Sequence, residues 1–120
     1  GYELVAVPTS EASRIQAETL GIPLAPVDGP WTIDVCVDGA DEVSANLDLI
    51  KGGGAAHTRE KIVNHSAKMN IIVVDDSKLS DKLGEKWHIP IEVLAFAHEA
   101  TAAHLAGFGS CARREKDTGD

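Results

Sequence analysis

Residues 31–61 read WTIDVCVDGADEVSANLDLIKGGGAAHTREK, and this stretch decides the fold class. Its first part, Trp31–Val37, alternates and then becomes continuously apolar, which predicts a strand. A polar turn and three consecutive glycines follow, and residues 55–67 then have the composition of a helix. The most strand-like run of the chain, Ile71–Val74, comes soon after. Strand, helix and strand in this order are typical of a mostly parallel sheet covered by helices.

The alternation of strand-like and helix-like segments continues on both sides of this stretch. Thr9 or Ser10 can cap a helix that Gly21 would end. The other predicted elements are strands at Leu4–Val7 and Ile89–Leu94, helices at residues 10–20 and Phe96–Leu105, an extended segment at Ile22–Val27, a charged loop at residues 75–86 and a polar tail at residues 110–120. The sequence therefore predicts an α/β fold, a Rossmann-like layer with helices on both faces of a mostly parallel sheet.

Length and charge limit the possible functions. A chain of 120 residues allows one domain, and the 43% hydrophobic and 25% charged fractions are ordinary for a globular protein. Eleven Lys and Arg against 19 Asp and Glu give a net charge of -8, which argues against nonspecific binding to nucleic acid or to a membrane surface. Cys36, Cys111 and the five histidines share no metal-ligand spacing, so no metal site is expected. We expect both cysteines to be free thiols in a reducing cytoplasm.

The first candidate site is the acidic turn after the predicted strand Trp31–Val37. Asp38 and Asp41 flank Gly39, which permits a sharp turn. Ligands of parallel sheets bind beyond the carboxyl ends of the strands, and there two carboxylates could orient sugar hydroxyls or move protons. The alternative is an ordinary acidic turn, because Asp and Gly are common turn residues.

The second candidate is Lys51 with the glycines that follow it, Gly52, Gly53 and Gly54. Exposed backbone N–H groups, the N-terminus of the next helix and the lysine charge could together hold a phosphate or an oxyanion. The spacing matches neither the Walker A motif nor the dinucleotide-binding motif. A flexible linker is the alternative interpretation.

Two further residues carry useful chemistry. Glu60 falls in the first turns of the predicted helix, near enough in sequence to Lys51 for the two to share a pocket, where the carboxylate could act as a general base. Lys78 follows the strongest predicted strand and could bind an anion. The alternatives are a solvated helix face for Glu60 and an ordinary surface lysine for Lys78.

Three motifs together resemble the type A ribose-5-phosphate isomerase family. They are Val37–Glu42, Asn46–Ala56 and Thr58–Ile62, and their order and spacing agree with those of the family. The resemblance extends to Thr9–Ser13, Asp76–Lys78 and Ile89–Val93. Members interconvert D-ribose 5-phosphate and D-ribulose 5-phosphate through an enediol(ate) in the non-oxidative pentose phosphate pathway, without a cofactor.

The resemblance implies a role for each candidate residue. Glu60 falls on the family's base, and Asp38 and Lys51 on its other catalytic positions. The implied substrate-binding residues are Asp38, Gly39, Ala40, Asp41, Lys51, Gly52, Gly53, Gly54 and Lys78. The family also implies a homodimer or a higher homo-oligomer.

The resemblance covers only the central part of the family's pattern. The upstream phosphate loop and the C-terminal region have no counterpart, so residues 1–120 are expected to be a single partial domain. His57 stands where the family usually has an apolar residue. The alternative functions are a phosphosugar-binding module without catalysis and an inactive fragment of the isomerase.

Overall fold

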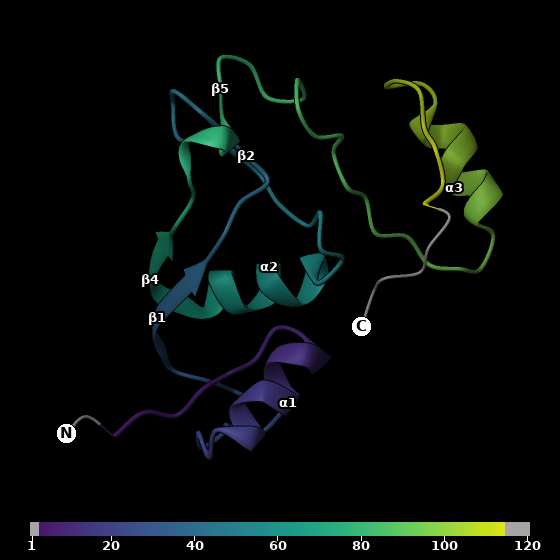
Figure 1. Ribbon diagram of the computed structural model, residues 1–120. Helices are drawn as coiled ribbons and strands as arrows, with labels where there is room; N and C mark the ends of the chain where they lie inside the picture. The colour runs from purple at the N-terminus through teal and green to yellow at the C-terminus, as the bar shows by residue number, and fades with distance from the viewer. Residues whose placement is uncertain (1–2, 115–120) are drawn as a thin grey trace.

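The computed structural model describes residues 3–114, so residues 115–120 of the expected polar tail lie outside the described part (Figure 1). Helices and strands alternate, as expected for an α/β protein. The elements are α1 (Glu11–Thr19), β1 (Ile33–Asp38), β2 (Glu42–Ser44), β3 (Leu49–Ile50), α2 (His57–Ser66), β4 (Ala67–Ile72), the 3-10 helix η1 (Asp76–Lys78), β5 (Leu79–Ser80) and α3 (His98–Leu105).

A parallel strand pair crossed by one helix forms the centre of the molecule. β1 and β4 pair in parallel, with Val35 opposite Met69 and Val37 opposite Ile71. The chain between them forms β2, β3 and then the helix α2, which packs against both strands (Figure 1). Cys36 of β1 and Val63 of α2 are buried in this unit. The predicted strand–helix–strand order and the α/β class are therefore confirmed.

A second, smaller sheet lies next to the central pair, in the strand order β3-β2-β5. β2 runs antiparallel to β3, which places Glu42 opposite Ile50, and parallel to β5, which places Val43 opposite Leu79. The turn between β2 and β3 is held by the hydroxyl of Ser44, which accepts backbone N–H groups of Asn46 and Asp48. This sheet brings the end of β3 close to the end of β1.

Several predicted boundaries were wrong. The strand expected at Leu4–Val7 is reduced to one isolated parallel bridge between Ala6 and Leu24. The segment Ile89–Leu94 forms no strand, because no ladder of backbone hydrogen bonds pairs it with a neighbour in the described part of the chain. The expected loop at residues 75–86 contains η1 and β5.

Other observed boundaries differ from the predicted ones by a few residues or agree with them. β4 starts at Ala67, directly after α2, and ends at Ile72, earlier than the predicted Ile71–Val74. α1 begins where expected, with the Ser10 hydroxyl accepting the N–H of Ser13 at 3.1 Å. α3 begins two residues late because Ala97 adopts a left-handed conformation with φ of 52°.

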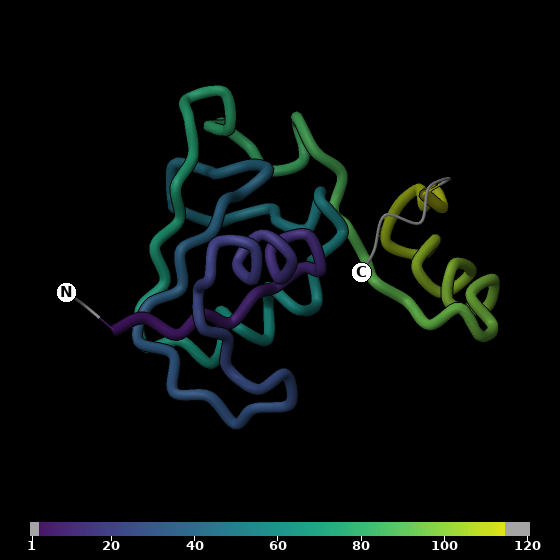
Figure 2. Tube along the Cα trace, turned by 60° about the horizontal axis from the view of Figure 1, so that its bottom comes forward, coloured from purple at the N-terminus to yellow at the C-terminus, as the bar shows by residue number. Residues whose placement is uncertain are grey.

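The hydrophobic core is small. The buried apolar side chains are Ala17, Cys36, Val43, Ile50 and Val63. The radius of gyration is 16.4 Å, against about 14 Å for a compact chain of this length. Figures 1 and 2 show the cause, since the chain after β5 leaves the body and carries α3 to one side. No helix in residues 3–114 is both long enough and apolar enough to cross a membrane.

Candidate active site

The ends of β1 and β3 bring Asp38 and Lys51 together. The backbone N–H of Asp41 donates to the carbonyl of Ile50 at 2.8 Å, and this holds the end of β3 against the acidic turn. Lys51 Nζ then lies 2.7 Å from Asp38 Oδ2 and 2.6 Å from the carbonyl oxygen of Gly39. The other Asp38 oxygen, Oδ1, accepts the N–H of Gly39 at 2.8 Å. Both oxygens of Asp38 are thus engaged, and this carboxylate holds the lysine in place.

Glu60 approaches the same lysine from the first turn of α2. Its Oε2 lies 3.2 Å from Lys51 Nζ in an ion pair between two largely buried side chains. Oε2 is a buried atom that meets this ammonium without forming a hydrogen bond of ordinary geometry. A buried acceptor without a hydrogen bond of ordinary geometry is unusual in a folded protein, and a catalytic role is one explanation for it. This oxygen is available to take a proton from a bound molecule.

The charge of Lys51 is stabilised by its two acidic neighbours. Burial by itself would lower the pKa of Lys51, but the hydrogen bond from its ammonium to Asp38 and the nearby charges of Asp38 and Glu60 outweigh burial and raise the pKa above its usual range. The lysine therefore stays protonated at neutral pH. A fixed cation next to a carboxylate can stabilise negative charge that develops on a bound molecule when the carboxylate removes a proton from it.

The glycines after Lys51 are packed closely against two side chains. The N–H of Gly53 donates to Asp41 Oδ2 at 2.6 Å, and a Cβ at this glycine would lie 2.6 Å from Asp41 Oδ1. Gly52 has a φ of 95°, and a Cβ there would lie 2.6 Å from the ring of His57. His57, which replaces the expected apolar residue, thus covers the loop. The loop is fixed by these contacts, and the N–H of Gly53 is already used by Asp41.

Two residues near the site were missed by the sequence reasoning. Asn64 donates from Nδ2 to the carbonyl of Glu60 at 2.9 Å and reaches Asp38 Oδ2 at 3.4 Å. Its spacing of four residues from Glu60 places it on the same helix face, and this signal could have found it. Arg114 donates from Nη2 to the carbonyl of Gly53 at 3.1 Å, and nothing in the local sequence indicates that contact.

Most of the predicted site residues line one cavity of about 170 Å³. Its lining consists of Asp38, Gly39, Ala40, Asp41, Lys51, Gly52, Gly54 and Glu60. Gly53 lies beside it through its contact with Asp41. Lys78 is outside the lining, at the end of η1, and its ammonium lies 5.7 Å from the ring centroid of Trp87. The structure therefore brings together every predicted site residue except Lys78.

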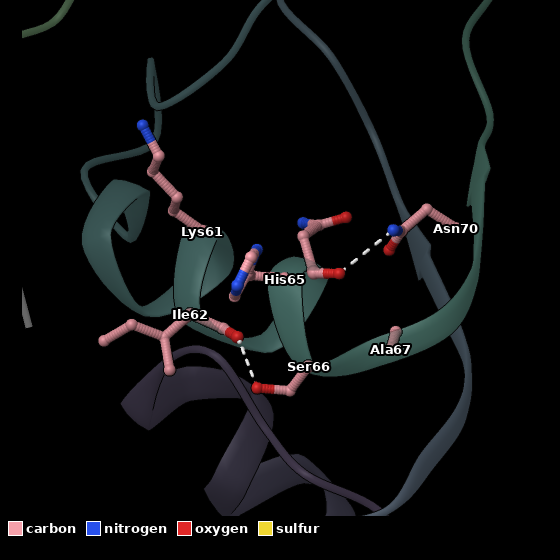
Figure 3. Close-up of a pocket in the computed structure, with 7 residues that line it drawn as sticks. Lys61, Ile62, His65, Ser66, Ala67 and Asn70 are labelled. Atoms are coloured by element: carbon pink, nitrogen blue, oxygen red, sulfur yellow. Dashed lines mark hydrogen bonds between the residues drawn. The ribbon is translucent and has the colours of Figure 1, made fainter.

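A larger and more open hollow of about 700 Å³ lies at the other end of α2 (Figure 3). Its lining consists of Lys61, Ile62, Asn64, His65, Ser66, Ala67 and Asn70. The Ser66 hydroxyl donates to the carbonyl of Ile62 at 2.8 Å, and the Asn70 amide donates to the carbonyl of Asn64 at 3.0 Å. No carboxylate faces this hollow, so the smaller cavity is the better candidate for acid–base chemistry. Within residues 3–114, no group of three or more His, Cys, Asp or Glu side chains could hold a metal ion.

Comparison with known proteins assigns the family. The family model described as ribose 5-phosphate isomerase A (phosphoriboisomerase A) matches residues 5–120. The chain belongs to this family. The ribose-5-phosphate isomerase A of Methanococcus aeolicus is 48% identical over 111 residues, which are 92% of this chain and 47% of that protein. The one from Thermococcus kodakarensis is 46% identical over 92% of this chain and 48% of its own length.

Solved structures of ribose 5-phosphate isomerases share the fold. One, a D-ribose-5-phosphate isomerase in complex with phospho-erythronic acid, has a TM-score of 0.83 and 47% identity over 89% of this chain and 47% of its own. The ribose 5-phosphate isomerase A of Methanocaldococcus jannaschii has a TM-score of 0.79 and 42% identity over 87% of this chain and 45% of its own. The chain thus spans about half the length of the relatives it matches.

Proposed function

We propose that this protein interconverts D-ribose 5-phosphate and D-ribulose 5-phosphate, with Glu60 as the general base. The observation that carries the proposal is the buried Oε2 of Glu60, ion-paired at 3.2 Å with the ammonium of Lys51 in a cavity that the acidic turn and the glycine loop enclose. Membership of the ribose 5-phosphate isomerase A family supports the reaction type. The proposed activity is that of the whole protein, because the curated relatives are about twice as long as this chain.

The reaction needs one base and one stabilised oxyanion. From the aldose, Glu60 removes the proton on C2, the electron pair forms the C1–C2 double bond, and negative charge develops on O1. Lys51 neutralises that charge. Glu60 then delivers its proton to C1, while the proton of the C2 hydroxyl passes to O1 and leaves a ketone at C2. Atoms and charge balance, and the carboxylate returns to its starting form.

The other site residues hold this geometry. Asp38 fixes the lysine through its 2.7 Å contact, and Asp41 fixes the glycine loop through the N–H of Gly53. In the proposal, Asp38 and Asp41 also meet sugar hydroxyls and assist ring opening. The backbone of Gly52 and Gly54, which line the cavity, faces the substrate in this proposal. Placing the reacting atoms in this way is a large part of catalysis.

The substrate is proposed to extend out of the cavity. Ligand pockets usually measure ~300–1,000 Å³, more than the 170 Å³ found here. The phosphate end would therefore lie outside, where Lys78 could bind it. One structural relative is a complex with phospho-erythronic acid, a phosphorylated sugar acid, and this supports a sugar phosphate as the ligand class.

The location and assembly of the protein are part of the same proposal. We infer a cytoplasmic homodimer or higher homo-oligomer, with residues 1–120 forming one partial α/β domain. Cys36 and Cys111 are both free thiols, which suits a reducing compartment. Exposed apolar side chains on β1 and β4 suit further contacts in the assembled protein.

Turnover and binding measured together test the proposed function. The full chain should form D-ribulose 5-phosphate from D-ribose 5-phosphate, and calorimetry should show binding of the same sugar phosphate. Binding without turnover would indicate the non-catalytic phosphosugar-binding module and contradict the proposal. Neither binding nor turnover in a folded full chain would contradict it as well.

A further inference from the structure

Glu42 is a buried carboxylate that the proposed reaction does not use. Its side chain is fully buried, although it directly follows Asp41 of the active site. Glu42, the first residue of β2, is not among the residues that line the cavity, whereas Asp41 is. A buried charge is costly unless it is hydrogen-bonded, and this one therefore requires a partner.

The partner is a run of four consecutive backbone N–H groups more than 40 residues later. Gly84 and Trp87 donate to Glu42 Oε2 at 3.0 and 3.2 Å. Glu85 and Lys86 donate to Oε1 at 3.2 and 3.4 Å. Successive N–H groups that converge in this way form an anion-binding concavity, and here the anion is a side chain of the same protein.

The charged state of Glu42 is favoured in this concavity. Burial by itself would raise the pKa of Glu42, but the neighbouring Ser80 and the backbone donors outweigh burial and lower the pKa. The Ser80 hydroxyl is buried beside the carboxylate without forming a hydrogen bond of ordinary geometry. The carboxylate is therefore ionised at neutral pH, and it holds the 84–87 segment by charge-assisted hydrogen bonds.

The 84–87 segment is in turn attached to the element that carries Lys78. Lys86 Nζ donates to the carbonyl oxygens of Ser77 at 2.7 Å and Leu79 at 2.6 Å, which flank Lys78. The ring of Trp87 faces the Lys78 ammonium at 5.7 Å, within the range of a cation–π contact. β5, which begins directly after Lys78, pairs with β2 directly after Glu42.

We propose that Glu42 is a positioning residue of the isomerase, which holds Lys78 at its place before β5 by anchoring the 84–87 segment. The inference rests on the proposed function, because it assumes that Lys78 binds the phosphate end of the substrate. Glu42 touches no reacting atom. Its loss should weaken substrate binding and leave the Glu60 and Lys51 chemistry in place.

The test is kinetic and uses the full chain. Glu42→Gln keeps the shape of the side chain but removes the charge and turns two acceptors into one acceptor and one donor. We expect KM for D-ribose 5-phosphate to rise at least about tenfold, because that is the effect of losing one charge-assisted contact. The value of kcat should stay within about threefold of that of the unchanged protein. Lys78→Met should raise KM similarly, and the double variant should be no worse than either single variant. Asp81→Asn, which removes an exposed carboxylate nearby, is the matched control and should change neither constant.

A second variant covers the case in which Glu42→Gln does not fold. Gly84 has a φ of 92°, so Gly84→Ala strains the segment while Glu42 keeps its charge. It should raise KM in the same direction without lowering kcat. An unchanged KM in folded Glu42→Gln or Gly84→Ala would overturn the inference, and so would a loss that adds to that of Lys78→Met. Absence of turnover in the unchanged protein would instead count against the proposed function.

Discussion

Lys51 is the residue that ties the site together. Its ammonium contacts Asp38 at 2.7 Å, the carbonyl of Gly39 at 2.6 Å and Glu60 at 3.2 Å. It thereby joins β1, the glycine loop and α2 through a single charge. Removing that charge would leave two carboxylates close together in a largely buried place, which is unfavourable for both.

Replacing Lys51 by Met should therefore make stability depend on pH in a defined direction. The pKa of Lys51 is raised in the folded protein, so its contribution is fully present below the unfolded pKa of about 10.4 and is lost as pH rises through the higher folded pKa. Near pH 7 the free energy of unfolding of Lys51→Met should be lower than that of the unchanged protein. This difference, the stability gap, should stay constant to about pH 10 and shrink above it. Urea titrations from pH 7 to 11 measure the gap. Lys82→Met, at an exposed position, is the control, and a gap that widened with pH would contradict the argument.

The residues of the site were predictable to different degrees. Asp38 and Glu60 could be found because they stand at the end of a predicted strand and in the first turns of a predicted helix, and Lys51 could be found because three glycines follow it. Asn64 could have been found from its spacing of four residues from Glu60. Glu42 could not, because its role depends on hydrogen bonds to groups that the local pattern does not reveal. Nothing in the sequence around Glu42 indicates that residues 84–87 surround it.

At the scale of elements, length decided what could be predicted. β1 and α2 have six and ten residues, enough to show their periodicity. β2, β3 and β5 have only two or three residues each, too few for a pattern to appear. Ile89–Leu94 has the composition of a strand, but a strand also needs a neighbouring edge to pair with, and that is not a local property.

The glycine loop between β3 and α2 gives a prediction at this scale. Gly53→Ala would place a Cβ 2.6 Å from Asp41 Oδ1 and should destabilise the protein by ~1–3 kcal/mol, because a packed carboxylate must move. Gly54→Ala, where nothing lies within 4 Å of a new Cβ, should stay within about 0.5 kcal/mol. Denaturant unfolding of the two variants measures the difference. Equal stability of both variants would show that the loop is not held against Asp41.

The whole molecule exposes an apolar sheet face. Val35 and Val37 of β1 alternate with buried Cys36, and their β4 partners Met69 and Ile71 are exposed as well. Exposed apolar faces of this kind mark surfaces that contact other parts of a protein or other copies. The chain spans about half the length of its curated relatives. The small core and the extended shape agree with a unit that is stabilised by further contacts.

The proposed acid–base site, by contrast, is assembled within the described residues. Its proposed base, its cation and its glycine loop come from α2 and from the ends of β1 and β3, all in the central part of the molecule (Figure 1). The proposed function depends most on proton transfer by Glu60.

The most direct measurement is the rate of D-ribulose 5-phosphate formation by Glu60→Gln in the full chain, with calorimetric binding of D-ribose 5-phosphate measured on the same sample. Because Gln cannot accept the C2 proton, we predict a fall in kcat of about a thousandfold or more, with binding within about threefold of the unchanged protein. Glu99→Gln, an exposed carboxylate on α3, is the control and should turn over normally. Turnover by Glu60→Gln at the rate of the unchanged protein would show that Glu60 is not the base.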